Sequence, residues 1–420
     1  MAGLGMIFEE TYLPAFIDLR KAPLYSRETG PVEVQWTAAA TRTGARGQKY
    51  LAQLPGALPT FTNHHGPQAL DEMLKQGVHL VCVATPDDRH FQAAKKSLEA
   101  GKHVLIEKPS VLKLEQLDVL VETARKNCVL AKVVYHKLAD PDHKKLRTHY
   151  ADGVLKHVNN GFCSLLEPKQ ISGQQFAEWI QGRNPGTYVA VHYIKLIDFS
   201  FGPSSCQPGW KLWRIGATGQ RGLVGKPDGK TWDSCQLQVT YLHPDNREAT
   251  FDIHTSWVNP DNFPGYVEQE VQFRFDNGIW NAHQRKRGVE MAVEDRSPHE
   301  IKNTPNHHYN GDFLEPWGAR SRRGYGIEII RKFFEEVAQV EFGGEKKDRE
   351  TRLKAMSDLH YNDLSADRNT VAIVQALEAL LEEHAGENPG CQVFVNDPLG
   401  GLVLRSPGGK PPRVLYSGTV

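Results

Sequence analysis

The sequence predicts an α/β domain built on a parallel sheet, followed by an α+β domain built on an antiparallel sheet. Two short apolar runs joined by a helical pattern, over residues 80–109, predict the parallel sheet, because parallel strands need a crossover connection. Alternating apolar and polar residues at 236–241 and 268–275 predict the antiparallel sheet, and Asp276-Asn277-Gly278 predicts a hairpin turn within it. The 420 residues are enough for two or three domains.

The first residues of the chain predict a dinucleotide site. Gly3 and Gly5 form the G-x-G of a dinucleotide fingerprint, and residues 9–19 are expected to form the helix that follows. The glycines allow a tight turn and let the backbone approach a pyrophosphate at the helix N-terminus. Phe8 occupies the third glycine position, which mainly serves helix–strand packing. Only two residues precede Gly3, so the strand that normally comes first is either reduced to a stub or lies upstream of this sequence.

The next predicted strand covers residues 31–40, and its end bears on the choice of cofactor. An acidic residue here usually hydrogen-bonds the adenine ribose of NAD, but the turn 41–46 contains no acid. Thr41, Arg42 and Arg46 suit a ribose 2′-phosphate instead, because a guanidinium offers planar, permanently charged donors. We therefore expect NADP(H) in preference to NAD(H); the alternative is an ordinary turn with a solvated arginine.

The strand–helix–strand unit brings two polar segments to one edge of the parallel sheet. Its strands are expected at 80–84 and 103–106. Thr85-Pro86 follows the first strand, and Glu107-Lys108-Pro109 follows the second. Ligands of open parallel sheets bind outside the carboxyl ends of the strands, so both segments are expected at a site. Further elements of this domain are expected at 49–52, 69–77, 114–126 and 128–135.

The same unit carries a resemblance to a known family. The pattern A-T-P-x-x-x-H, a helix, then G-K-H-V-L-I-E-K-P resembles the glucose–fructose oxidoreductase/inositol dehydrogenase family. That family couples a Rossmann domain to an open-faced sheet domain and oxidises or reduces sugars and polyols with a nicotinamide cofactor. The resemblance implies that Lys108 hydrogen-bonds the reacting hydroxyl and helps to shuttle its proton. The expected cofactor contacts are Gly3, Gly5, Met6, Ile7, Thr41, Arg42, Arg46, Thr85, Pro86, His90, Glu107, Lys108 and His136.

The substrate side of the resemblance is weaker. His192 matches the histidine of the family's D-x-G-x-H-x-x-D pattern, but the other positions hold Tyr188, Ala190 and Lys195. The resemblance implies that His192 is the acid/base partner of Lys108; the alternative is a half-buried helix histidine. Lys195 would be a second cation that eases deprotonation of Lys108. The expected substrate contacts are Lys108, Tyr188, His192 and Lys195.

The boundaries follow from these patterns. We expect an NADP(H)-binding Rossmann domain at 1–137, an α+β substrate and oligomerisation domain at 138–385, and a Gly/Pro-rich arm at 386–420. The resemblance is firm over roughly the first 137 residues and looser to Glu383. Within the second domain, the main expected elements are a strand at 156–166, helices at 176–180, 187–199, 325–338 and 367–384, and strands at 211–218, 234–242, 249–257, 267–275 and 278–284.

Composition excludes several function classes. Lys plus Arg and Asp plus Glu each total 50, so the zero net charge gives no support for nucleic-acid or anionic-membrane binding. The six cysteines are scattered without a C-x-x-C pair, and the adjacent His307 and His308 have no acid or cysteine spaced to complete a metal site. No apolar run has the length of a membrane span, and no signal region begins the chain, so we expect a cytoplasmic protein without a metal.

The leading hypothesis is an NAD(P)-dependent oxidoreductase that moves hydride between nicotinamide and a hydroxyl or carbonyl carbon of a sugar, sugar derivative or polyol. Two alternatives use the same fold. One is a non-enzymatic dinucleotide-binding regulator, which the altered pattern around His192 favours. The other is redox-assisted glycoside cleavage with the cofactor regenerated in each cycle. Because the sheet domain of this family commonly pairs between subunits, the resemblance also implies a homo-oligomer.

Overall fold

The computed structural model describes most of the chain in two compact units. The first unit contains Met1–Asp140 and His308–Asp367, and the second contains Pro141–His307 and Arg368–Val420. The described residues exclude 54–55, 57–59, 171, 173–179, 203–209, 225–228, 263–266, 284–288, 294–299, 305–309, 315, 317–319 and 387. The helix expected at 176–180 falls largely on excluded residues, and the pair His307 and His308 falls on them entirely.

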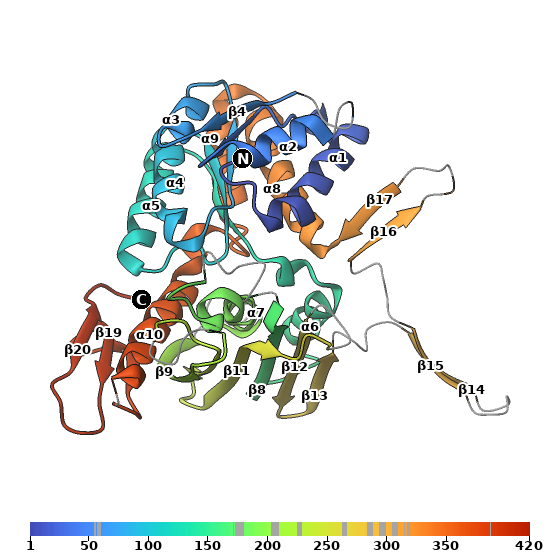
Figure 1. Cartoon of the computed structure of the whole chain (residues 1–420). Helices are drawn as coiled ribbons and strands as arrows, with labels where there is room; N and C mark the ends of the chain where they lie inside the picture. Colours follow the sequence, from blue (N-terminus) through green and yellow to red (C-terminus); the bar gives the residue numbers. More distant parts are fainter. Residues whose placement is uncertain are drawn as a thin grey trace. The chain divides into compact units, whose positions relative to one another are not determined.

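The first unit is built on a parallel sheet (Figure 1). β3 (Ala38–Thr41) pairs with β4 (Thr62–His65), and β5 (Leu80–Val83), β6 (His103–Glu107) and β7 (Ala131–Val134) form a second run. These two groups are joined by the first residues of the chain, because Ala2 makes parallel bridges to both Ala40 and Val83. Within the described chain, the strand expected before the Gly3–Gly5 loop is therefore reduced to a bridge at one residue.

The bridge at Ala2 still satisfies the backbone on both sides. Ala2 donates its N–H to Cys82 at 2.8 Å, and Ala84 donates back to the Ala2 carbonyl at 2.8 Å. On the other side, the Ala40 N–H donates to the Met1 carbonyl at 2.8 Å, and the Gly3 N–H donates to Ala40 at 3.0 Å. Four ladder hydrogen bonds thus hold residues 1–3 at the centre of the sheet.

The prediction of one continuous strand over residues 31–40 is wrong. β2 (Gly30–Val32) folds back on β1 (Leu24–Ser26) in a small hairpin, and only β3 enters the parallel sheet. Gly30 has φ of +65°, which suits the tight return between β1 and β2. Trp36 lies in the connection between β2 and β3, where it is buried and stacks on Phe61 with ring centroids 3.9 Å apart. The apolar pattern of 31–40 therefore reflects a buried tryptophan in a connection, not one continuous strand.

Helices flank the parallel sheet, and their apolar spacing explains why. α4 (His90–Glu99) and α5 (Leu114–Lys126) bury Leu98, Leu117 and Leu120 while their charged residues stay exposed. The bounds of α5 agree with the expected helix at 114–126. The other helical elements of this unit are η1 (Phe8–Tyr12), α1 (Leu13–Lys21), α2 (Ala45–Gln53), α3 (Ala69–Leu74), η2 (Asp87–Arg89), η3 (His136–Ala139), α8 (Tyr325–Phe342), η8 (Lys346–Asp348), α9 (Arg349–Ser357) and η9 (Leu364–Asp367).

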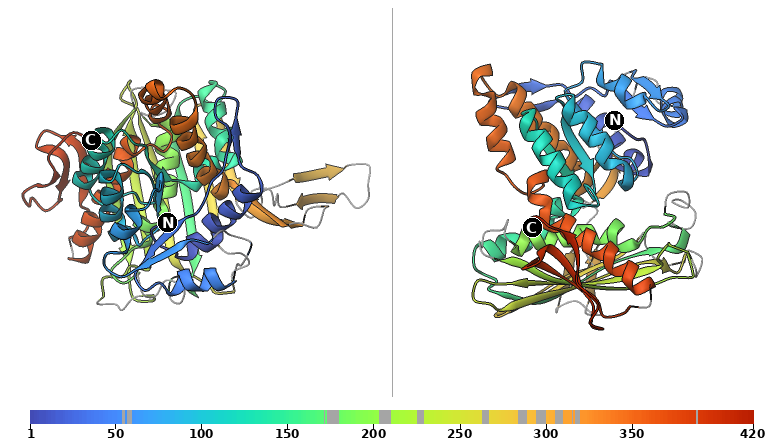
Figure 2. Two further views of the ribbon diagram at one scale, coloured as in Figure 1. Left: turned by 90° about the horizontal axis from the view of Figure 1, so that it is seen from above. Right: turned by 90° about the vertical axis from the view of Figure 1, so that its left-hand side faces the viewer.

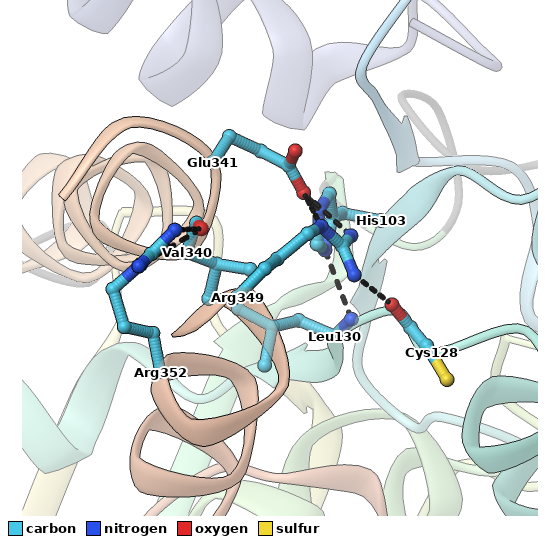
Figure 3. A network of polar contacts seen from close by, with 7 residues as sticks. All are labelled: His103, Cys128, Leu130, Val340, Glu341, Arg349 and Arg352. Atoms are coloured by element: carbon cyan, nitrogen blue, oxygen red, sulfur yellow. Dashed lines mark hydrogen bonds and ion pairs between the residues drawn. The ribbon is translucent and has the colours of Figure 1, made fainter. Parts of the chain in front are cut away.

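A polar network fixes α8 and α9 to the amino ends of β6 and β7 (Figure 3). His103 Nδ1 accepts the Leu130 N–H at 2.9 Å, so Nε2 carries the proton that is donated to Glu341 at 2.8 Å. Arg349 donates to the same carboxylate and, through Nη1, to the Cys128 carbonyl at 3.0 Å. Hydrogen bonding from His103 lowers the pKa of Glu341 to about 2. This network stabilises the edge of the sheet opposite to Lys108.

The second unit contains one nine-stranded sheet, with the order β13-β12-β8-β11-β10-β9-β18-β19-β20. Neighbouring strands are antiparallel except for β8 and β11, which are parallel. The alternating burial along β12 bears out the alternation in its sequence. The strands are β8 (Val158–Pro168), β9 (Lys211–Gln220), β10 (Ser234–Leu242), β11 (Glu248–Asn259), β12 (Glu268–Phe275), β13 (Gly278–His283), β18 (Gln392–Asp397), β19 (Gly400–Arg405) and β20 (Arg413–Tyr416). The last three come from the tail, so the tail extends this sheet.

Helices cover one face of this sheet (Figure 2). They are α6 (Pro141–Ala151), η5 (Gly186–Ala190), α7 (Val191–Phe201) and α10 (Arg368–Ala385). Phe201 at the end of α7 stacks on Phe251 with centroids 5.9 Å apart and meets Phe273 edge-on at 5.1 Å. The sequence predicts α7 to be amphipathic, but ten of its eleven residues are buried. α7 packs on the sheet through Phe201 and also contacts the neighbouring helices α6 and α10.

In the sequence between β13 and α8, the structure also contains two short hairpins. They pair β14 (Val289–Val293) with β15 (Glu300–Thr304) and β16 (Asn310–Leu314) with β17 (Arg320–Gly324). None of the helices in the described part of the chain is long and apolar enough to cross a bilayer.

Candidate active site

The Gly3–Gly5 loop has the geometry that the fingerprint requires. Gly3 has φ of +92°, and a Cβ added there would lie 2.4 Å from the Ala84 carbonyl oxygen. A Cβ on Gly5 would meet only Arg46 Nη1, at 3.6 Å. Helical backbone begins at Met6 and Ile7, and the N–H groups of Phe8 and Glu9 turn back to the Gly5 carbonyl. Gly3 is therefore needed for the fold itself, whereas Gly5 keeps open the space beside a helix N-terminus.

Phe8, which replaces the third glycine, is accommodated by aromatic neighbours. Its side chain is fully buried, and its ring lies 4.9 Å from Trp36 and 5.1 Å from Tyr50 between centroids. The space that close helix–strand packing would fill is occupied here by an aromatic cluster. The departure from G-x-G-x-x-G thus changes the packing beneath the helix and leaves the loop around Gly5 intact.

The turn after β3 is held rigidly beside this loop. Thr41 Oγ1 accepts the Gly44 N–H at 3.0 Å, and Asn63 donates to the Gly44 carbonyl at 2.8 Å. Arg46 donates through Nη1 to the Leu4 carbonyl at 3.1 Å, so it is tied to the Gly3–Gly5 loop. Arg42 is exposed at the carboxyl end of β3. The structure thus brings the predicted residues Thr41, Arg42 and Arg46 to one edge of the sheet.

The end of β6 carries the polar residues that the sequence predicts for the reaction centre. Glu107 is buried, and its Oε1 accepts a hydrogen bond from the Tyr12 hydroxyl at 2.9 Å. Burial raises the pKa of Glu107 to about 7, against the opposing effects of the Lys108 charge and the Tyr12 hydrogen bond. Lys108 follows directly and is half-buried. Near neutral pH, the Glu107 carboxyl group next to Lys108 therefore exists in both its charged and its neutral form.

His90 joins the two loops that the sequence places at this edge. Its ring nitrogens lie 2.7 Å from the Pro109 carbonyl and 2.7 Å from the Thr85 carbonyl, and the residue is 1% exposed. A neutral imidazole has one N–H, so it donates to one of these carbonyls at a time, whereas a protonated ring donates to both. His90 thus holds Thr85-Pro86 beside Glu107-Lys108-Pro109. Pro86 is exposed there and Thr85 is half-exposed.

His136 adds a neutral group to the same neighbourhood. Burial lowers its pKa to about 3, and the positive charges of Lys108 and Lys137 act in the same direction. Lys137 is 3% exposed, and its ammonium lies 5.3 Å from the centre of the Tyr325 ring. Sequence reasoning missed Lys137 as a second cation acting on His136, although its position directly after His136 could have indicated it.

A second missed residue, Asp367, fixes the chain just after Lys108. Its carboxylate accepts hydrogen bonds from the Ser110 hydroxyl at 2.5 Å and from the Tyr135 hydroxyl at 2.8 Å. Asp367 and Ser110 are both fully buried. The sequence places Asp367 only near the start of a late helix. No local pattern links it to a residue 257 positions earlier.

The residues predicted for the substrate side lie in the second unit. His192 is 9% exposed on α7, and Tyr188 precedes it on η5, where its ring lies 6.3 Å from Trp257 between centroids. Lys195 is fully buried, with its ammonium 3.9 Å from the Asp198 carboxylate. Burial raises the pKa of Asp198, and the Lys195 charge opposes that shift. The roles of Tyr188, His192 and Lys195 toward substrate and toward Lys108 stay predictions.

Comparison with known proteins adds to this geometry. Residues 1–135 match the family described as "Oxidoreductase family, NAD-binding Rossmann fold", GFO_IDH_MocA. Residues 1–135 are therefore similar to the Rossmann domain of this oxidoreductase family. The match contains the Gly3–Gly5 loop, Glu107 and Lys108, and it confirms the expected Rossmann domain.

The family domain has curated relatives with sugar substrates. D-glucoside 3-dehydrogenase of Escherichia coli is 27% identical over 197 residues, which cover 46% of this chain and 53% of that protein. D-xylose 1-dehydrogenase (NADP(+)) of Hypocrea jecorina is 35% identical over 121 residues, which cover 29% of this chain and 30% of that protein. The matches thus span about half of one relative and under a third of the other.

The fold of both units recurs in solved structures. An inositol dehydrogenase homolog of Azotobacter vinelandii, complexed with NADH and myo-inositol, matches with a TM-score of 0.65 and 18% identity. The alignment covers 93% of this chain and 95% of that chain. It confirms an α/β Rossmann domain followed by an open-faced sheet domain. Among the described residues, no group of three or more His, Cys, Asp or Glu side chains is arranged to hold a metal ion.

Proposed function

We propose that the chain is a nicotinamide-dependent oxidoreductase that acts on a CH–OH group of a sugar, sugar derivative or polyol. One observation carries this proposal: Lys108 lies at the carboxyl end of β6, next to buried Glu107, in a domain that also has the Gly3–Gly5 loop. Both features sit at the sheet edge where parallel α/β folds bind ligands. The two sugar dehydrogenases among the relatives support the substrate class.

The residues present fit a dinucleotide. The space above Gly5 admits a close backbone approach, and the helix that starts at Met6 and Ile7 offers N–H groups to a pyrophosphate. His90 holds Thr85-Pro86 at the adjacent edge. When bound, the nicotinamide supplies the hydride chemistry. The protein's own residues bind, orient and manage the proton of the reacting group.

Proton management falls to Lys108 in this proposal. Its ammonium group donates a hydrogen bond to the reacting oxygen and exchanges the proton that accompanies oxidation or reduction. His136 stays neutral beside it, because burial lowers the pKa of His136 to about 3. His192 is proposed as the acid/base partner, with Tyr188 and Lys195 orienting substrate hydroxyls. These last three assignments rest on the resemblance of 188–195 to the family pattern.

We also propose a preference for NADP(H) over NAD(H). Exposed Arg42, with Thr41 and Arg46, supplies positive charge and a hydroxyl at the end of β3 and no acid. A bidentate guanidinium suits a ribose 2′-phosphate, and an acid would repel it. The xylose dehydrogenase relative, which is named for NADP(+), supports this choice.

The test is binding of NADPH and NADH followed by nicotinamide fluorescence. We expect tight NADPH binding and weaker NADH binding by the native chain. Gly5→Ala should stay folded, because its Cβ meets only Arg46 Nη1 at 3.6 Å, but should weaken NADPH binding on the order of tenfold or more by filling the phosphate space. Gly77→Ala is the matched control, since a Cβ there has no neighbour within 4 Å.

The second test measures NADPH production or consumption with a panel of sugars and polyols, and Lys108→Met is the inactive reference. Net NADPH production or consumption supports the oxidoreductase. Turnover without net change in NADPH would instead support redox-assisted glycoside cleavage. Binding without turnover would support a dinucleotide-binding regulator. If neither dinucleotide binds to the native chain, or Gly5→Ala binds as tightly as the control, the proposed function is wrong.

We further propose a cytoplasmic homo-oligomer that pairs through the sheet domain. Along the less buried face of β10 and β11, side chains form polar ladders, such as Gln238 to Asp252 at 3.0 Å and Gln236 to His254 at 2.9 Å. Cys82, Cys163 and other described cysteines are free thiols, as in reducing compartments. Light scattering after size-exclusion chromatography measures the oligomer, and a monomeric mass would contradict it.

A further inference from the structure

One buried polar pair connects the Gly3–Gly5 loop to Lys108. The Tyr12 hydroxyl donates to Glu107 Oε1 at 2.9 Å, and the two residues are 0% and 5% exposed. Tyr12 ends η1, the helical turn that follows the loop, whereas Glu107 ends β6 and immediately precedes Lys108. The pair thus ties the segment proposed to hold the cofactor phosphates to the residue proposed to meet the reacting oxygen.

Glu107 is the group in this cluster whose charge changes near neutral pH. Burial raises its pKa to about 7, while the Lys108 charge and the Tyr12 hydrogen bond oppose that shift. From β5, Cys82 faces the same carboxyl group, and burial raises the pKa of its thiol to about 12. From η1, burial and the Glu107 charge raise the pKa of Tyr12 well above its usual value. Tyr12 and Cys82 therefore stay neutral while Glu107 titrates.

We propose that Tyr12 is a positioning residue for the reaction at Lys108. Its hydroxyl stabilises the charged form of the Glu107 carboxylate, and that carboxylate in turn favours the ammonium form of Lys108. The inference rests on the proposed oxidoreductase function. It adds to the residues that support the reaction Tyr12, which lies 95 positions before Glu107 in the chain. When the pH falls, Glu107 takes a proton from solvent, and Lys108 loses its adjacent counter-charge.

The first test removes only the hydroxyl, with Tyr12→Phe. The Glu107 carboxylate then loses one charge-assisted donor, so its titration should move upward by about one pH unit. Two measurements follow it. One is the inflection of kcat/KM against pH. The other is the infrared carbonyl band of a protonated carboxyl group, recorded on the protein without cofactor or substrate.

Two further variants make the test specific. Tyr50→Phe is the matched control, because the Tyr50 hydroxyl donates to Glu9 at 3.1 Å and Glu9 is exposed on the same domain. It should leave the inflection where it is. Glu107→Gln keeps an oxygen that accepts from Tyr12 but cannot titrate. It should abolish both the inflection near pH 7 and the infrared band that changes with it.

The outcomes separate this inference from the proposed function. An inflection that stays in place in folded Tyr12→Phe, or that persists in Glu107→Gln, overturns the inference. If Tyr12→Phe does not fold, an inflection that persists in Glu107→Gln still overturns the inference. Absence of NADPH binding and turnover by the native chain would overturn the proposed function. The infrared titration of the cofactor-free protein would still report whether Tyr12 controls Glu107.

Discussion

Gly3→Ala should destabilise the first unit more than an ordinary glycine replacement does. Gly3 has φ of +92°, and the left-handed region costs an alanine about 1–2 kcal/mol. The added Cβ would also lie 2.4 Å from the Ala84 carbonyl oxygen and 2.8 Å from its carbon. Both atoms are backbone, so the contact is relieved only if β5 or the chain start moves.

The size of that second effect follows from the bridge at Ala2. Moving Ala84 away lengthens the hydrogen bond from the Ala84 N–H to the Ala2 carbonyl, now 2.8 Å. Moving Gly3 lengthens the hydrogen bond from the Gly3 N–H to the Ala40 carbonyl, now 3.0 Å. Each such bond contributes roughly 0.5–1.5 kcal/mol. Together with the backbone conformation, the free energy of unfolding should fall by about 2–5 kcal/mol.

Gly30→Ala is the matched control for this prediction. Gly30 also has positive φ, +65°, but a Cβ there has no neighbour within 4 Å. It should cost only the conformational part, about 1–2 kcal/mol. Differential scanning calorimetry of the two variants and the native chain measures the difference. Equal losses for Gly3→Ala and Gly30→Ala would refute the idea that contact with Ala84 makes Gly3 indispensable.

Two further predictions concern buried charges of the first unit. Lys132→Met should cost about 3–5 kcal/mol, because it leaves Glu336 buried without the ammonium now 2.8 Å away; Lys132→Met/Glu336→Leu should recover most of the loss in chemical denaturation. Glu107→Gln should flatten the pH dependence of stability. Because its pKa is raised to about 7, native Glu107 binds its proton more tightly than the unfolded chain does. The free energy of unfolding of the native chain should therefore fall as the pH rises from about 4.5 to 7. Above pH 7 the variant should be more stable by up to about 3 kcal/mol in denaturation at pH 8, and a native pH profile without this decline would contradict the reasoning.

Local patterns predict individual helices and strands well where one short segment determines them. The apolar spacing of α5 gives both of its ends, and the alternation of β12 gives its buried face. The same reasoning fails for residues 31–40, where an apolar pattern reflects Trp36 packed on Phe61 and not a strand. It also fails for α7, because amphipathic spacing does not reveal that ten of its eleven residues are buried.

The proposed reaction centre divides in the same way. Lys108 is recognisable because its motif is contiguous, but what holds Lys108 in place is not. Tyr12 binds Glu107 from 95 positions away, and Asp367 binds Ser110 from 257 positions away. A hydrogen bond depends on where two side chains meet in space, and sequence spacing carries no such information for residues on different elements.

Three residues from other elements contact the segment around Lys108, two through its side chains and one through its backbone. Tyr12 of η1 holds Glu107, His90 of α4 lies against the Pro109 carbonyl, and Asp367 of η9 accepts from Ser110. All three partners are buried, so their contacts with residues 107, 109 and 110 are shielded from competing water. Lys108 is the one residue of this segment that is half-exposed. A side chain left partly accessible between three anchored neighbours loses little further freedom when it meets a substrate oxygen, which is the arrangement that a proton-transferring group requires.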